Sequence, residues 1–176
     1  MPSFGRPIRF LDLGCGDGGL TLALLQTLCD RGHADGIDSI LLVDPSANML
    51  RTARQLLTGA FPKTRIDVLQ GRAEVVAVEI PPGFDIALSS LAWHHMPYDI
   101  KRDLAGYLAA RVDHVLLFEI EGHHDTPELH SPALAVSVYQ LYGAAVEMVM
   151  AQAARREVIE ARLDQFLTGE LISLMT

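Results

Sequence analysis

The chain has 176 residues, a length that suits one domain with one sizeable core. Apolar residues make up 49% and charged residues 20%, which excludes a disordered chain, and the net charge of −8 argues against a nucleic-acid binder. Cys15 and Cys29 are the only cysteines, which excludes a disulfide scaffold and favours a reducing cytoplasm. The first ten residues lack the apolar stretch of a signal peptide.

Strand and helix patterns alternate along the first 120 residues. Short β-type runs predict strands at residues 8–13, 40–43, 65–69, 84–88 and 115–120. Apolar residues at helical spacing predict helices at residues 20–28, 49–57 and 100–110. The alternation predicts an α/β fold of the Rossmann-like, doubly wound type, with a mostly parallel sheet covered on both faces.

After Glu121 no further strand is visible. Ser131 can cap a helix that has Pro132 at its first position and runs to about residue 154, and a second helix is expected over residues 156–167. The 131–154 segment is long enough to span a bilayer, but Gln140, Glu147 and Gln152 interrupt it, so we expect a buried or interface helix. Because it is apolar nearly all round, we expect it to cover the active site and to form a homodimer contact.

A glycine-rich loop follows the first strand. Gly14, Gly16 and Gly19 also fit the dinucleotide pattern GxGxxG, and a bare glycine match is weak because any strand-to-helix turn can use glycine. Asp12 stands two residues before the first glycine, where an acid suits an ammonium group better than a pyrophosphate, which it would repel. Asp44 ends the second strand, where a carboxylate can accept both ribose hydroxyl protons or cap the next helix.

The stretches LDLGCGDGG, LLVDPSANML and FDIALSSLAWHHMP resemble, in order and spacing, the motifs of class I S-adenosylmethionine-dependent methyltransferases, most closely the broad small-molecule group. The resemblance covers roughly residues 8–122, which we take as the cofactor-binding core (1–122), with 123–176 as a helical lid or interface segment of the same domain. It implies S-adenosylmethionine as the cofactor. It places Gly14, Gly16 and Gly18 beside the methionine part with Asp12 near its amine, Asp44 at the ribose, the 71–74 loop with Ala73 and Glu74 at the adenine, and Ser89, Ser90 and Leu91 beside the sulfonium. Cys15, Pro45 and Met49 are further candidates for contact with the cofactor.

The sequence departs from that family in three places. Many relatives carry an adenine-binding aspartate where this chain has Arg72, which cannot accept a hydrogen bond, so Ala73 or Glu74 would have to substitute. Relatives usually have a helical N-terminal segment over the cofactor and a final antiparallel hairpin after the fifth strand, and neither is visible here. An unprotected edge strand is a liability, so we expect a missing tail or a partner chain.

Histidines and acids follow the fourth and fifth strands. His95 and His94 are the first candidates for a general base toward a protic acceptor, and His123 and His124 are the next. The alternative for each histidine is a purely structural role in its loop. Carboxylate and imidazole groups at residues 119–130 also leave a metal open, but strand alternation separates them, so no metal is predicted.

These patterns predict methyl transfer to a small-molecule acceptor, with no nucleic-acid or membrane partner. Methylation of a nucleic-acid amine is disfavoured because Ser89-Ser90-Leu91-Ala92 stands where those enzymes resemble one another in an Asn/Asp-Pro-Pro-aromatic stretch. Two alternatives remain: a non-catalytic relative that binds the cofactor or serves as a partner subunit, and an NAD-dependent oxidoreductase on a related fold.

Overall fold

A computed structural model describes residues 3–93, 96–119, 131–136, 139–140 and 143. The chain divides into two compact units, Met1–Glu119 and Ile120–Thr176, which are described separately.

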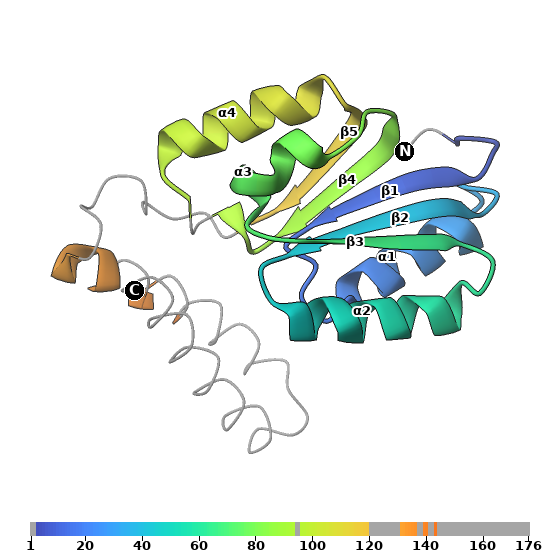
Figure 1. The fold of residues 1–176 in the computed structure, drawn as a ribbon, viewed down its shortest axis with the longest axis horizontal. Helices are drawn as coiled ribbons and strands as arrows, with labels where there is room; N and C mark the ends of the chain where they lie inside the picture. Colours follow the sequence, from blue (N-terminus) through green and yellow to red (C-terminus); the bar gives the residue numbers. More distant parts are fainter. Residues whose placement is uncertain (1–2, 94–95, 120–130, 137–138, 141–142, 144–176) are drawn as a thin grey trace, which may run out of the picture. The chain divides into compact units, whose positions relative to one another are not determined.

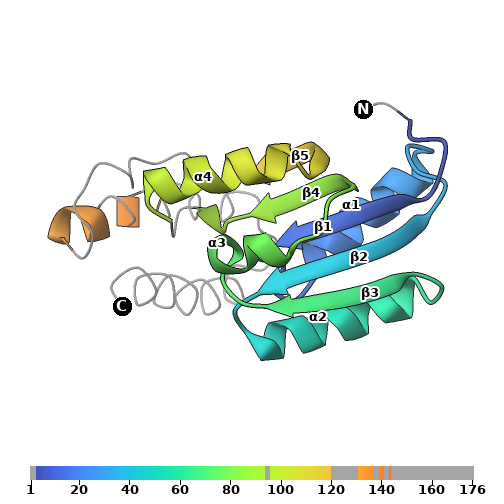
Figure 2. The same ribbon diagram turned by 45° about the horizontal axis from the view of Figure 1, so that its top comes forward.

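The first unit is built on one parallel sheet with the strand order β3-β2-β1-β4-β5 (Figures 1 and 2). The chain leaves the middle of this sheet in both directions, so the order reverses between β1 and β4. In open α/β sheets, ligands bind beside the carboxyl ends of the strands at such a reversal. The strands are β1 (Ile8–Leu13), β2 (Ile37–Asp44), β3 (Arg65–Gln70), β4 (Phe84–Ser90) and β5 (Val112–Phe118).

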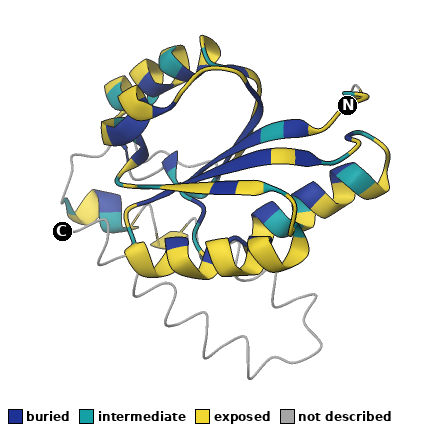
Figure 3. Ribbon diagram, turned by 45° about the vertical axis from the view of Figure 1, so that its right-hand side comes forward, coloured by how far each residue is buried: buried dark blue, intermediate teal, exposed yellow. Residues whose placement is uncertain are grey.

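Helices cover both faces of the sheet, because strands buried on two sides need an apolar layer on each. One face carries α1 (Gly19–Asp30) and α2 (Ala47–Ala60), and the other carries α3 (Ala73–Val76), the 3₁₀ turn η1 (Ala77–Glu79) and α4 (Tyr98–Ala109). The central strands are almost wholly buried, whereas β3 is largely exposed or half-buried (Figure 3).

The sheet residues alternate between two apolar cores. Phe10, Ile40 and Ile86 pack with the helices α1 and α2 on one face. Leu11 and Ala87 pack with α3 and α4 on the other face. This alternation sends Asp12 toward the α1 side, since it stands an even number of residues after Phe10.

The predicted fold class is confirmed, and all five predicted strands and the first three helices are present. Two strands begin three residues earlier than predicted, at Ile37 and Val112, because polar residues at their amino ends hide the apolar run. The last strand ends at Phe118, not at residue 120 as predicted, since Glu119 lies outside β5. Neither α3 nor η1 was predicted, because these elements have four and three residues, too few to show a helical period.

The second unit is described only in part. Residues 132–136 are helical, and the backbone amide of Leu134 donates to the Ser131 hydroxyl at 3.1 Å, so the predicted cap at Ser131 is confirmed. The expected helix over 156–167 lies outside the described residues, as does most of the 131–154 helix. Within the described part of the chain, no helix is long and apolar enough to cross a membrane. In the first unit the described strands pair only in parallel, and β3 and β5 are the edges of the described sheet.

Candidate cofactor site at the carboxyl ends of the strands

The glycine loop between β1 and α1 is held in a conformation that favours glycine. Gly14, Gly16 and Gly18 have φ angles of 78°, 52° and 80°. A Cβ added at Gly14 would lie 2.7 Å from the Ala92 Cβ, and one at Gly18 would lie 2.9 Å from the Ala53 Cβ. A Cβ at Gly16 would meet nothing within 4 Å. Packing therefore requires two of these glycines, whereas Gly16 borders open space.

Asp44 joins the end of β2 to this loop. Its carboxylate accepts the backbone N–H of Gly16 at 3.0 Å through Oδ2 and that of Ser46 at 2.8 Å through Oδ1. A carboxylate offers about four lone-pair sites, so each oxygen keeps capacity for one more donor, such as a hydroxyl. Asp44 is 8% exposed, so little of it is open to solvent.

Asp12 is the most perturbed acid of the site. Its carboxylate is 2% exposed and accepts the Thr21 hydroxyl of α1. Burial raises the pKa of Asp12 to about 7, the Thr21 hydrogen bond opposes that rise, and the charge of Asp44 adds to it. A nearby cation would favour the ionised form of this carboxyl, which is what the prediction of an ammonium at this position requires.

The loop is acidic on more than one side. Asp17 Oδ1 accepts the Gly19 amide at 2.9 Å, so one donor at the α1 amino end is already satisfied by an anion. Asp12, Asp17 and Asp44 form no ion pair among the described residues. Burial and these aspartates also raise the pKa of the Cys15 thiol, which is therefore neutral. Such a loop attracts a cation and repels a pyrophosphate.

The turn after β3 is hydrogen-bonded to the end of β2, where Asp44 lies. The Gly71 amide donates to the Asp44 carbonyl at 3.1 Å. Arg72 Nε donates to Glu74 Oε1 at 2.6 Å, and Ala73 begins α3. Arg72 therefore orients the Glu74 carboxylate, which lies two residues after the position where relatives are expected to carry an aspartate.

The end of β4 is joined to its neighbours on both sides. The Ser89 hydroxyl donates to the Leu13 carbonyl at 2.9 Å, and the Leu91 amide donates to the Phe118 carbonyl at 2.9 Å. Leu91 has a φ of 52°, which is a strained value for a bulky residue. Strained backbone of this kind is often found at functional sites. The Trp93 amide donates to Glu119 at 2.7 Å. The loop after β4 is thus fixed to the end of β5.

The predicted cofactor residues lie at the carboxyl ends of β1, β2 and β4 or in the segments that follow β1, β2, β3 and β4. Met49 lies in the first turn of α2, where its amide donates to the Ser46 hydroxyl, and Pro45 accepts from Gln70. The predicted bases His94, His95, His123 and His124 lie outside the described residues. Sequence reasoning missed Thr21 and Asp17, whose only signal was a polar group near the loop, and it missed the Trp93–Glu119 link. The described residues contain no cluster of three metal-ligating side chains.

A family model described as a methyltransferase domain matches residues 10–112, which is more than half of the chain. The chain belongs to this family, and its sheet is that of the class I S-adenosylmethionine-dependent methyltransferases. No curated protein sequence matches it.

Solved structures give the same fold. WbdD is 27% identical over 64% of this chain and 24% of its own length, with a TM-score of 0.52. YcgJ from Bacillus subtilis is 21% identical over 81% and 52%, with a TM-score of 0.51. The mitomycin 7-O-methyltransferase MmcR is 22% identical over 77% and 36%, with a TM-score of 0.52. This chain thus spans between a quarter and about half of these proteins.

Proposed function

We propose that this chain binds S-adenosylmethionine and transfers its methyl group to a small-molecule acceptor. The observation that carries the proposal is the Asp44 carboxylate, which is anchored by two backbone amides beside the glycine loop and keeps acceptor capacity for ribose hydroxyls. When bound, the cofactor supplies an electrophilic methyl group on a sulfonium.

The charge of the loop favours this cofactor over NAD. The carboxylates Asp12, Asp17 and Asp44 surround a loop whose first helical amide is already accepted by Asp17. A dinucleotide needs that helix end for its pyrophosphate. We propose instead that Asp12 lies near the amine of the cofactor, and that Glu74, held by Arg72, accepts from the adenine amine.

The acceptor is proposed to be a small molecule because of charge and motif. A net charge of −8 disfavours a nucleic acid, and the Ser89-Ser90-Leu91-Ala92 stretch differs from that of amine-methylating nucleic-acid enzymes. WbdD is described as a bifunctional kinase-methyltransferase and MmcR as an O-methyltransferase, so neither name decides the attacking atom here. We propose His95 or His94, and then His123 or His124, as the base for a protic acceptor.

Replacing Gly16 with alanine tests the loop. The new Cβ meets no protein atom within 4 Å, so it enters the space proposed for the methionine part. We expect Gly16→Ala to weaken S-adenosylhomocysteine binding at least tenfold in a calorimetric titration, while the free energy of unfolding falls by about 1–2 kcal/mol from the strained φ.

Gly32→Ala is the matched control, because Gly32 also has a positive φ of 69° and open space at its Cβ, and it lies after α1. It should lose similar stability and keep the affinity. Equal affinities for the two variants would contradict the placement of the cofactor at the loop. A parallel titration with NAD should show no binding, and binding of NAD alone would favour the oxidoreductase.

We also propose a cytoplasmic homodimer with its contact on the 131–154 helix. Val136 and Tyr139 are exposed on the described part of that helix. Light scattering after gel filtration should give twice the chain mass, and a monomer at high concentration would contradict the contact. Turnover on no acceptor despite cofactor binding would favour a non-catalytic partner subunit.

A further inference from the structure

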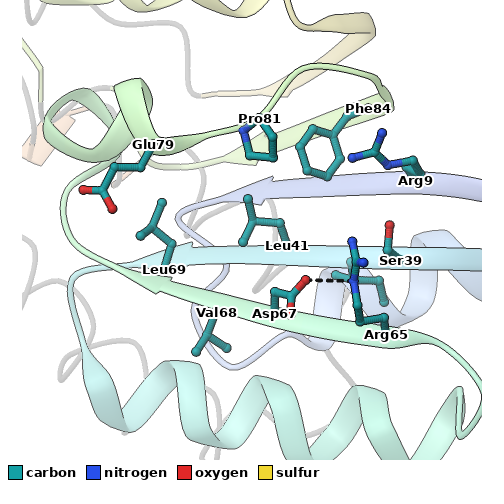
Figure 4. Close-up of a pocket in the computed structure, with 11 residues that line it drawn as sticks. Arg9, Ser39, Leu41, Arg65, Asp67, Val68, Leu69, Glu79, Pro81 and Phe84 are labelled. Atoms are coloured by element: carbon teal, nitrogen blue, oxygen red, sulfur yellow. Dashed lines mark ion pairs between the residues drawn. The ribbon is translucent and has the colours of Figure 1, made fainter.

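A groove on the α3 and α4 side of the sheet lies away from the cofactor edge. It has a volume of about 210 Å³ and is bordered by the amino-terminal halves of β1 and β2, by β3 as far as Leu69, and by the segment that leads into β4 (Figure 4). Ser39 lies five residues before Asp44 on β2, which is about 16 Å at the usual rise per residue. The end of the groove that holds Arg9, Ser39 and Arg65 is therefore separate from the proposed S-adenosylmethionine site.

The strand register places three polar residues in one row across the groove. Arg9 of β1 pairs with Ser39 of β2, and Ser39 pairs with Arg65 of β3. Register partners on neighbouring parallel strands project from the same face, about 4.8 Å apart. Figure 4 shows the Ser39 side chain between those of Arg9 and Arg65. Two guanidinium groups thus flank one hydroxyl.

The Ser39 hydroxyl lacks a partner. The residue is 2% exposed, and its Oγ is buried without a hydrogen bond to any described residue. A buried polar atom without a partner is uncommon in native proteins and calls for an explanation such as a bound molecule. Its position between two guanidinium groups points to a ligand with negatively charged oxygens.

Both arginines are available to such a ligand. Arg9 lies over the Phe84 ring with 5.0 Å to the centroid, its Nη1 is 3.5 Å from the Pro82 carbonyl, and it forms no ion pair with a described residue. The Arg65 side chain is 69% exposed, and among the described residues it pairs with Asp67, itself exposed, at 3.0 Å. The Arg65 side chain can therefore leave Asp67 and turn toward a ligand at little cost.

The rest of the groove is lined by both apolar and acidic side chains. Leu41 and Leu69 line its middle, and Glu79 lies at the end opposite to Arg9 and Arg65. The volume is below the roughly 300–1,000 Å³ of pockets for drug-sized ligands. The groove suits a small molecule with an anionic head at the arginine end and a short apolar body, because Glu79 and Asp67 would repel a second negative charge.

We propose that this groove binds a small organic oxyanion, whose carboxylate or phosphoryl group contacts Arg9, Ser39 and Arg65 and whose apolar part covers Leu41 and Leu69. Arginine recognises both groups with paired hydrogen bonds. The site does not depend on the proposed methyltransferase activity.

The test uses the full chain, amide NMR titrations at constant ionic strength, and three probes: inorganic phosphate, phenyl phosphate and benzoate. We expect saturable shifts around Arg9, Ser39 and Arg65, with phenyl phosphate tighter than inorganic phosphate because its ring covers the leucines. Saturation by benzoate but not by phenyl phosphate assigns a carboxylate ligand, and the reverse assigns a phosphoryl ligand. Failure of all three probes overturns the proposal, as does their displacement by S-adenosylhomocysteine.

Variants separate a built site from general surface charge. Arg9→Gln and Arg65→Gln should each weaken the best probe about fivefold or more, whereas Arg51→Gln, an exposed arginine on α2, should leave it unchanged. Ser39→Ala should raise the melting temperature without a probe, since a buried orphan hydroxyl is removed, and should weaken the probe about threefold. Equal effects of all three arginine variants would contradict the proposal, as would a Ser39→Ala protein that binds the probe as well as the parent.

Discussion

Asp44→Asn is expected to weaken S-adenosylhomocysteine binding by at least about 100-fold, because two interactions of a charged acceptor are lost at roughly 1.5 kcal/mol or more each. Asp44 accepts the amides of Gly16 and Ser46 through different oxygens. An asparagine has one acceptor oxygen, and its NH₂ group would face one of these N–H groups. The loop loses an anchor, and the ribose hydroxyls lose an ionised acceptor.

Calorimetric titration measures this loss, and Asp38→Asn is the control. Asp38 is an exposed residue near the start of the same strand, so it has the same change in charge without contact to the loop. The control should bind within twofold of the parent. A folded Asp44→Asn protein with parental affinity would refute the role given to this carboxylate.

Asp12→Asn is expected to stabilise the protein at neutral and alkaline pH. The folded pKa of about 7 exceeds the ordinary aspartate value of 3.8, so between these values the folded chain holds a proton that the unfolded chain has lost. The free energy of unfolding of the parent therefore falls as pH rises from about 4 to 7 and then stays low. Asparagine is never ionised and can still accept the Thr21 hydroxyl, so it avoids this loss.

The expected gain above pH 7 is up to about 4 kcal/mol, from about three pH units at 1.36 kcal/mol each, and it shrinks toward zero near pH 4. Denaturant unfolding between pH 4.5 and 8.5 measures it, again against Asp38→Asn. A difference that does not change with pH would show that Asp12 does not titrate in this range.

The release of a proton when the cofactor binds tests whether its amine lies near Asp12. If the cofactor's amine lies near Asp12, its positive charge lowers the pKa of that carboxyl, and binding near pH 6.5 releases a proton. Calorimetry in two buffers of different ionisation enthalpy detects the release. It should disappear in Asp12→Asn, and its absence in the parent would place the amine elsewhere.

The sequence alone determined the strands of the sheet and showed that the candidate site lies at their carboxyl ends. Buried parallel strands are continuous apolar runs, as at residues 40–43, and the glycines and acids that follow them stand out against those runs. The matching residues 10–112 agree with the family assigned from the motifs. The start of β2 at Ile37 could not be placed, because the polar residues Asp38 and Ser39 separate it from the apolar run that follows.

Only the tertiary structure decided which groups meet. It shows that Asp12 faces Thr21, that Asp44 anchors Gly16, and that Arg9, Ser39 and Arg65 form one row. These pairs are separated by between 9 and 30 positions in sequence, and register and side-chain direction join them. A one-residue change in register moves every side chain to the other face, so no local pattern determines such contacts.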